Sequence, residues 1–192
     1  MPCIFLSASI PLPDHDAKYQ ETADVIAIRD SIRALVSVVV PTGHIVFGGH
    51  PAITPLIRML VHGMTPQVNQ HIILYQSAFH RREFPPETAE FERIRIIEAN
   101  DIDEATSLRR MREAMIGGHK FDAGIFIGGM DGVEREYEMF ARMHPNSPAY
   151  PIASTGAAAR ILFHEYARDR SELLTDLRYL SLFRRLLEIG SV

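Results

Sequence analysis

The chain has 192 residues, 46% of them hydrophobic, and a formal net charge of −4 at pH 7. This size predicts a single domain over 1–192 that closes with a C-terminal helix at 170–189. The acidic balance argues against a general nucleic-acid binder, and no apolar run approaches the roughly 20 residues that span a bilayer. The N-terminal "MPCIFLSASIPLP" has no basic segment of a signal peptide, and a single cysteine excludes an intrachain disulfide. We therefore expect a cytoplasmic protein with no membrane or nucleic-acid partner.

Short apolar runs alternate along the chain with helical patterns. The predicted strands are 3–9, 44–49, 71–76, 93–99, 123–129 and 150–155. The predicted helices are 22–40, 54–64, 103–118, 132–144, 156–169 and 171–189, with a loop and a short helix within 77–92. Strands that alternate with helices and carry continuous apolar runs are typical of buried parallel strands. The sequence thus predicts a Rossmann-like, doubly wound α/β fold with a mostly parallel sheet and helices on both faces.

Two of the predicted strands end in paired glycines just before a helix. "IVFGGHPAITP" places Gly48 and Gly49 at one junction, and "IFIGGMDGVERE" places Gly128, Gly129 and Gly132 at another. Ligands of open parallel sheets bind beyond the carboxyl ends of the strands, and glycines with free amides at a helix start favour a phosphate. The alternative is that these glycines only form tight turns. Neither junction has a Walker A or a Gly-x-Gly-x-x-Gly dinucleotide pattern.

The second junction also carries carboxylates. Asp131 is a candidate helix cap, and Glu134, Glu136 and Glu138 follow it. Glu136 lies one helical turn after Gly132 on the same face, so it can point toward a ligand above the glycines. Glu134 and Glu138 are better explained as acidic residues that complement the helix dipole.

Four further residues are candidates for the same crevice. Ser7 lies near the end of the first strand, and His50 directly follows Gly49, where it donates to a phosphate or is solvated. Ser154 and Thr155 stand at a third strand-to-helix turn, where they contact a ligand or cap the helix. The nine histidines show no metal signature, so we expect no metal and no cofactor.

The two glycine junctions together resemble the SLOG superfamily. It joins the lonely-guy phosphoribohydrolases to DprA-like proteins and to ligand-sensing domains of TRPM channels and bacterial antiviral systems. The phosphoribohydrolases carry a Pro-Gly-Gly-x-Gly-Thr-x-x-Glu motif that supplies a phosphate loop and a carboxylate acting at the ribose. The resemblance implies the phosphate role for Gly128, Gly129 and Gly132 and the ribose role for Glu136.

The chain departs from this motif at several positions. Ile127 replaces the proline, Val133 replaces the threonine, and Met130 with Asp131 stands where the motif has one residue. The resemblance is closer to divergent SLOG branches that are associated with nucleotide signalling in bacterial conflict systems.

The catalytic families also carry an arginine in the preceding helix. Here "LRRMREAM" places Met111 at that position, between Arg110 and Arg112. Neighbouring helical residues point about 100° apart, so the sequence leaves open whether a flanking arginine takes its place.

The function that these residues favour is binding or sensing of a nucleotide-derived small molecule, such as an ADP-ribose-like ligand or a nucleoside monophosphate. In this hypothesis the glycines and their neighbours Met130 and Asp131 hold phosphate, Glu136 reads the ribose, and Arg109 or Arg112 supplies charge. One alternative is a phosphoribohydrolase or related N-glycosidase with Glu136 and Arg112 as catalytic residues. Another is an interaction module with purely structural glycine turns. We also expect a homo-oligomer and an effector protein as partner.

Overall fold

The computed structural model describes residues 1–14, 16–64, 70–99 and 103–189. Six strands form one sheet: β1 (Cys3–Ser9), β2 (His44–Gly48), β3 (Ile72–Ser77), β4 (Ile94–Ile97), β5 (Ala123–Gly128) and β6 (Ala149–Ile152). Their order is β4-β3-β2-β1-β5-β6, and every pair of neighbours is parallel. The chain leaves β1 toward β2 on one side and later returns to the other side of β1 with β5. This reversal is the switch point of a doubly wound sheet, so the predicted fold class is confirmed.

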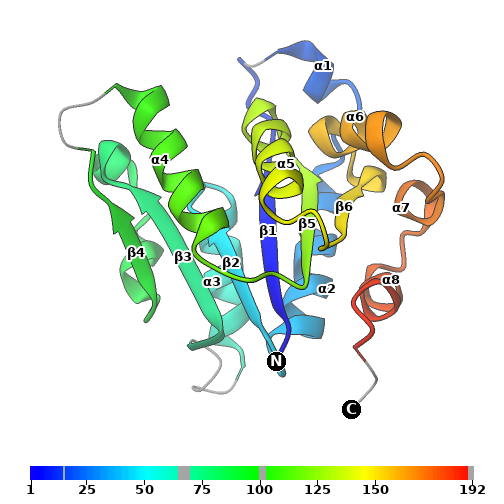
Figure 1. The fold of residues 1–192 in the computed structure, drawn as a ribbon, viewed down its shortest axis with the longest axis horizontal. Helices are drawn as coiled ribbons and strands as arrows, with labels where there is room; N and C mark the ends of the chain where they lie inside the picture. The colour runs from blue at the N-terminus through cyan, green and yellow to red at the C-terminus, as the bar shows by residue number, and fades with distance from the viewer. Residues whose placement is uncertain (15, 65–69, 100–102, 190–192) are drawn as a thin grey trace.

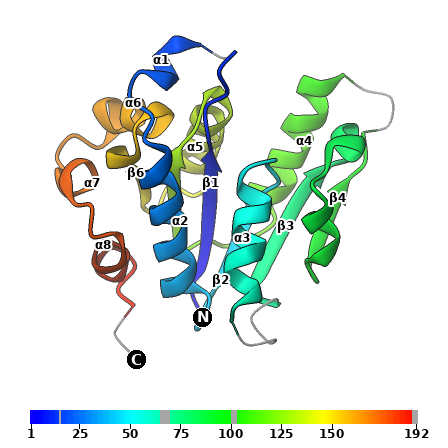
Figure 2. The same ribbon diagram turned by 180° about the vertical axis from the view of Figure 1, so that it is seen from behind.

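Helices cover both faces of the sheet (Figures 1 and 2). One face carries α4 (Glu104–Gly117), α5 (Asp131–Met143) and α6 (Ala157–Tyr166), which lie in front in Figure 1. The other carries α2 (Val25–Val39), α3 (Ile53–His62) and α8 (Tyr179–Leu186), which lie in front in Figure 2. The shorter elements are α1 (Ala17–Gln20), η2 (Ala78–Glu83), η3 (Pro86–Glu90), η4 (Ala153–Thr155) and α7 (Glu172–Thr175).

The last predicted helix, 171–189, is wrong in one respect, since the structure divides it into α7 and α8. The break lies at Asp176, whose carboxylate accepts hydrogen bonds from the backbone amide of Arg178 and from the Arg185 side chain. A side chain that binds the backbone two residues onward favours a turn over a continuous helix. The short helix α1 was also absent from the predicted elements.

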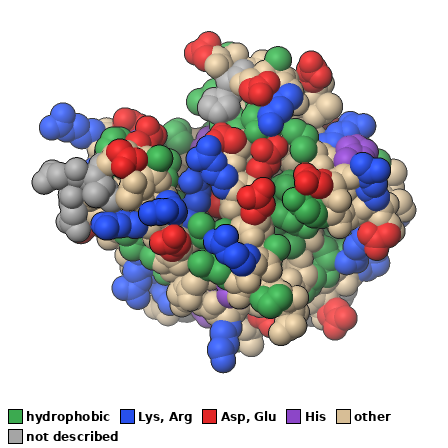
Figure 3. Space-filling view, turned by 45° about the horizontal axis from the view of Figure 1, so that its top comes forward, with side chains coloured by type: hydrophobic (Ala, Val, Ile, Leu, Met, Phe, Trp, Pro, Cys, Tyr) green, Lys and Arg blue, Asp and Glu red, His purple; other side chains and the backbone are tan. Residues whose placement is uncertain are grey.

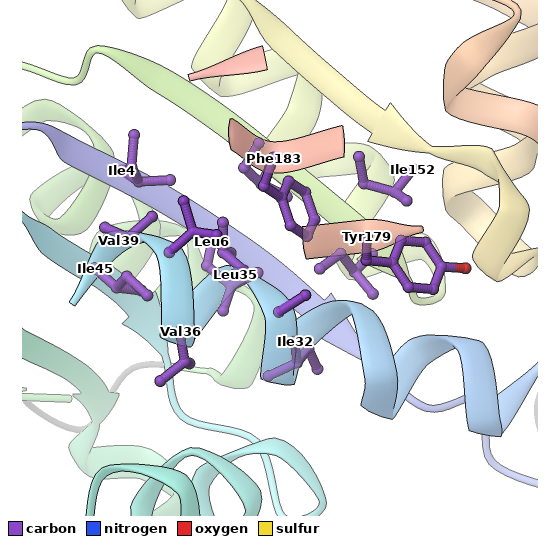
Figure 4. Packing of buried hydrophobic residues seen from close by; sticks show 14 of the residues in the cluster. Ile4, Leu6, Ile32, Leu35, Val36, Val39, Ile45, Ile152, Tyr179 and Phe183 are labelled. Carbon is purple, nitrogen blue, oxygen red and sulfur yellow. The ribbon is translucent and has the colours of Figure 1, made fainter. Parts of the chain in front are cut away.

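The alternation of β1 decides which of its side chains reach the later site. Ile4 and Leu6 pack with Leu35 and Phe183 on the face covered by α2 and α8, as the close view in Figure 4 shows. Phe5 points to the opposite face, where its ring stacks on Phe140 of α5 with centroids 5.5 Å apart. Successive strand residues point to opposite faces, so Ser7 follows Phe5 onto the α5 side.

Among the described residues, no helix has both the length and the apolar character required to cross a membrane.

Candidate functional site

A pocket of the described structure lies beyond the carboxyl ends of the central strands, at the switch point. It has a volume of about 380 Å³. It is lined by the ends of β1, β2 and β3, by the segment 83–85, by α4 and by the start of α5. The two glycine junctions of the sequence therefore do meet at one pocket, as Gly48, Gly49 and Gly132 all line it.

Glu136 is the centre of the polar contacts in this pocket. Its Oε2 accepts a hydrogen bond of 2.6 Å from the Ser7 hydroxyl, and its Oε1 lies 3.2 Å from Nε of Arg112. The Arg112 and Glu136 side chains are only 12% and 13% exposed, so solvent screens this ion pair little. Strand β1, helix α4 and helix α5 thus each contribute one side chain to a single hydrogen-bonded group.

The structure settles which arginine of α4 faces the pocket. Arg112 pairs with Glu136, while Met111, which also lines the pocket, is only 5% exposed and belongs to the hydrophobic core on this face of the sheet. Gly132 leaves room for the guanidinium, since a Cβ at that position would lie 3.3 Å from Nη2 of Arg112. An arginine one position later than in the motif therefore meets the carboxylate.

Gly128 and Gly129, in contrast, lie outside the pocket lining. Both have positive φ angles, +56° and +91°, and their amides already donate within the protein. Gly128 N–H bonds Oγ1 of Thr155 at 2.8 Å, and Gly129 N–H bonds the carbonyl oxygen of Ser9 at 2.8 Å. These glycines form the turn that starts α5, and their amides are not free to hold a ligand.

The backbone amides of the turn between β2 and α3 also donate hydrogen bonds within the protein. Gly49 N–H donates to the carbonyl oxygen of Tyr75, His50 N–H donates to Oγ1 of Thr54, and Ala52 N–H donates to Nδ1 of His50. This turn lines the pocket, but these three amides already donate to acceptors within the protein.

His50 is a neutral side chain at this turn. Burial lowers the pKa of His50 to about 4. Because Nδ1 accepts a bond from the Ala52 amide, the neutral ring carries its proton on Nε2. His50 can therefore offer one donor to a ligand, without a positive charge.

The start of α5 does face the pocket, through Met130, Asp131 and Gly132. The first amides of a helix have no acceptor inside the helix, and they favour negative charge. Asp131 is not the cap, because Met130 holds that position and Asp131 is the first helical residue. Its carboxylate lies 3.2 Å from Arg135, and with Glu134 it already complements the positive end of the helix.

The remaining candidates lie elsewhere. Thr155 is fully buried, where its hydroxyl accepts from Gly128 N–H and donates to the carbonyl oxygen of Ile152. Ser154 bonds the Tyr179 hydroxyl, and neither residue caps α6, whose first amide, at Ala157, donates to the Thr22 hydroxyl instead. Capping is therefore wrong for this pair, and neither residue lines the pocket, so contact with a ligand stays a prediction. Arg109 lies outside the pocket with its side chain 67% exposed.

The sequence reasoning missed several polar residues of the pocket. Gln76 and Ser77 end β3 beside the glycine turn, and their place at a strand end is a signal that could have found them. His80 lies with Nδ1 3.1 Å from Glu83 and Nε2 3.2 Å from Glu104. Glu83 is only three residues from His80, but the contact with Glu104 joins segments that are distant in the sequence, and no local pattern predicts it.

The pocket is acidic. Its described lining carries more carboxylates than arginines: Glu83, Glu104, Asp131 and Glu136, against Arg112. Figure 3, which looks toward this end of the sheet, shows acidic side chains in the middle of the face and arginine or lysine side chains beside them toward α4. The described residues contain no group of three or more metal-ligating side chains. The lining suits hydroxyl groups and a polar ring better than a highly charged anion.

Comparison with known proteins gives one match. Neither the search of curated proteins nor that of solved structures finds a match. The model of the SLOG cluster3 family matches residues 18–187, which include every part of the pocket except the end of β1 and Leu12. Membership of this family suggests binding or processing of a nucleotide-related molecule. The chain belongs to the SLOG cluster3 family.

Proposed function

We propose that the pocket binds the ribose and base of a nucleotide-derived small molecule, and that the protein acts as a sensor of that molecule. The observation that carries this proposal is the contact of Glu136 with both Ser7 and Arg112 inside the pocket. Pockets for small ligands commonly measure about 300–1,000 Å³, and the volume here, about 380 Å³, lies within that range.

The unused hydrogen-bond acceptors of Glu136 match the hydroxyl groups of a sugar. Each carboxylate oxygen accepts more than one hydrogen bond, so Glu136 retains acceptor capacity after its bonds to Ser7 and Arg112. Two neighbouring ribose hydroxyls are the donors that a carboxylate binds in this way. The Ser7 hydroxyl, which already donates to Glu136, remains able to accept from a ligand.

The apolar part of the lining offers a place for the base. Leu12, Phe84 and Leu108 line the pocket together with its polar residues. Flat ring systems bind well against such side chains. The recognition of a nucleoside therefore requires only side chains that already surround the pocket.

Cleavage of the N-glycosidic bond is the second candidate. Loss of the base builds positive charge on the ribose, and a nearby carboxylate stabilises that charge. The guanidinium of Arg112, 3.2 Å from Glu136, offsets part of the negative charge that this role needs. The ion pair therefore favours recognition of hydroxyls over stabilisation of a sugar cation.

The test compares wild type with Glu136→Gln in titrations with AMP, NAD and ADP-ribose. Calorimetry should show that at least one ligand binds and that the variant weakens it about tenfold or more, because a hydrogen bond to a charged group contributes about 1.5–3 kcal/mol. Glu92→Gln, at an exposed position outside the pocket, is the matched control and should leave Kd unchanged.

Chromatography of the same mixtures separates the two functions. A sensor leaves all three nucleotides intact. Release of free base by wild type but not by Glu136→Gln would establish the hydrolase instead. Equal affinity of wild type and Glu136→Gln for every ligand, with no base released by wild type, would contradict both.

A further inference from the structure

A second hollow lies next to the pocket, between helices α4 and α5. Its walls carry Arg109 and Arg112 from α4 and Arg135 and Arg142 from α5, and we refer to it as the arginine groove. Glu138 is the carboxylate that lines it, and its volume is about 440 Å³. At neutral pH four guanidinium groups thus face one carboxylate among the described lining residues.

The arginines of the groove are positioned to bind an anion in addition to their present carboxylate partners. The Arg109 and Arg135 side chains are 67% and 61% exposed, and their ion pairs are neighbours on their own helices. Exposed pairs of this kind contribute little stability. Ala105 and Thr106, which have small side chains, also line the groove. Like charges on two adjacent helices repel each other, and a bound anion would relieve that repulsion.

The groove and the pocket share one wall. Arg112 lines both, with its guanidinium beside Glu136 on the pocket side. A molecule whose sugar contacts Glu136 is therefore next to the groove as soon as it extends past Arg112.

The pocket itself is a poor place for several phosphates. The amides of Gly49, Gly128 and Gly129 donate to protein acceptors, and the carboxylates of the lining repel anions. The lining of the adjoining groove instead carries four arginines and one carboxylate, and the ion pairs of Arg109 and Arg135 there are exposed. Arginine is also the residue best suited to phosphate, since its planar group donates two parallel hydrogen bonds.

We infer that the arginine groove binds the phosphates of the molecule whose ribose occupies the pocket, and that the ligand class carries a diphosphate. This inference rests on the proposed function and narrows it, because a nucleoside monophosphate would leave most of the groove unused. ADP and ADP-ribose are therefore expected to bind better than AMP.

The experiment measures Kd for AMP, ADP, ADP-ribose and inorganic pyrophosphate with three proteins. They are wild type, the double variant Arg109→Gln with Arg142→Gln, and Arg33→Gln. Arg109 and Arg142 are exposed, so their replacement preserves the fold, and Arg33 is an exposed arginine on α2, across the sheet from the groove. Wild type and Arg33→Gln should bind ADP and ADP-ribose at least tenfold more tightly than AMP, and the double variant should lose this preference. The preference should also shrink at high salt.

The possible results distinguish failure of the groove proposal from failure of the pocket proposal. Equal affinity of wild type for AMP, ADP and ADP-ribose, or a preference that the double variant keeps, overturns the groove while the pocket proposal stands. If no nucleotide binds any protein, the proposed function fails, and pyrophosphate still tests the groove by itself. Pyrophosphate binding that the double variant abolishes then supports an anion site here, and absence of pyrophosphate binding overturns it.

Discussion

At the residue scale, two glycine pairs that look alike in the sequence have different roles. Gly128 has a φ angle of +56°, and a Cβ there would lie 2.5 Å from Cδ1 of Ile28. At Gly48 a Cβ would meet only the flexible ends of Met111 and Met115 at 3.5 Å, which is ordinary contact. Backbone strain therefore requires glycine at 128, while Gly48 tolerates a methyl group.

This difference predicts the outcome of two alanine substitutions. Gly128→Ala should lower the free energy of unfolding by at least about 1–3 kcal/mol, the usual cost of a side chain in a sparsely populated region, because contact with Ile28 adds to it. Gly48→Ala should change it by less than about 1 kcal/mol. Urea denaturation followed by circular dichroism measures both, and equal losses would show that strain at Gly128 is not what the position demands.

Some residues of the site could be predicted from the sequence, and others could not. Glu136 was predictable because its spacing from Gly132 is a local helical property. The pairing with Arg112 was not, since a rotation of about 100° between neighbours decides which of Arg110, Met111 and Arg112 faces α5. The bonded state of the Gly128 amide also escaped prediction, because its acceptor Thr155 is 27 residues away.

At the element scale, the strands were predicted well and the ends of helices less well. Apolar runs such as 123–129 mark buried strands directly, since burial on both faces leaves no room for polar alternation. The division of 171–189 into α7 and α8 depends on the contact of Asp176 with Arg185, nine residues further on. A contact of this kind interrupts the helix, and the helical pattern of apolar residues in the sequence does not reveal it.

Thr155 is the element-scale link between β5 and β6. Its hydroxyl joins the amide at the end of β5 to the carbonyl oxygen of Ile152 in β6. Thr155→Val keeps the shape but leaves both groups unpaired, so we expect a loss of about 1–3 kcal/mol in the free energy of unfolding. Thr175→Val is the control, because that exposed hydroxyl bonds only the Ser171 carbonyl of its own helix turn. If Thr155→Val lowers the free energy of unfolding no more than Thr175→Val does, the hydrogen bonds of Thr155 do not stabilise the fold.

At the scale of the whole molecule, the sheet separates two cores, and the switch point between β1 and β5 brings the site residues together. Histidines with lowered pKa values are distributed over this frame, at His44, His50 and His119, and burial is the main cause at each. The family model matches residues 18–187, which include most of this sheet and its helices. Homo-oligomerisation and an effector partner stay predictions.

These histidines predict how stability depends on pH. A histidine with a pKa near 6.5 when unfolded and a lower pKa when folded takes up its proton first in the unfolded state. For His50 the stabilising effect of the neutral form is complete above pH 6.5 and is lost progressively as the pH falls to about 4. The free energy of unfolding of wild type should therefore decline over this interval, with a slope of up to about 1.4 kcal/mol per pH unit for each group. His50→Gln should flatten the slope, whatever its effect at pH 7, while substitution of the exposed His62 should not. Parallel curves for wild type and His50→Gln between pH 6.5 and 4 would mean that His50 is protonated in the folded protein as readily as in the unfolded chain.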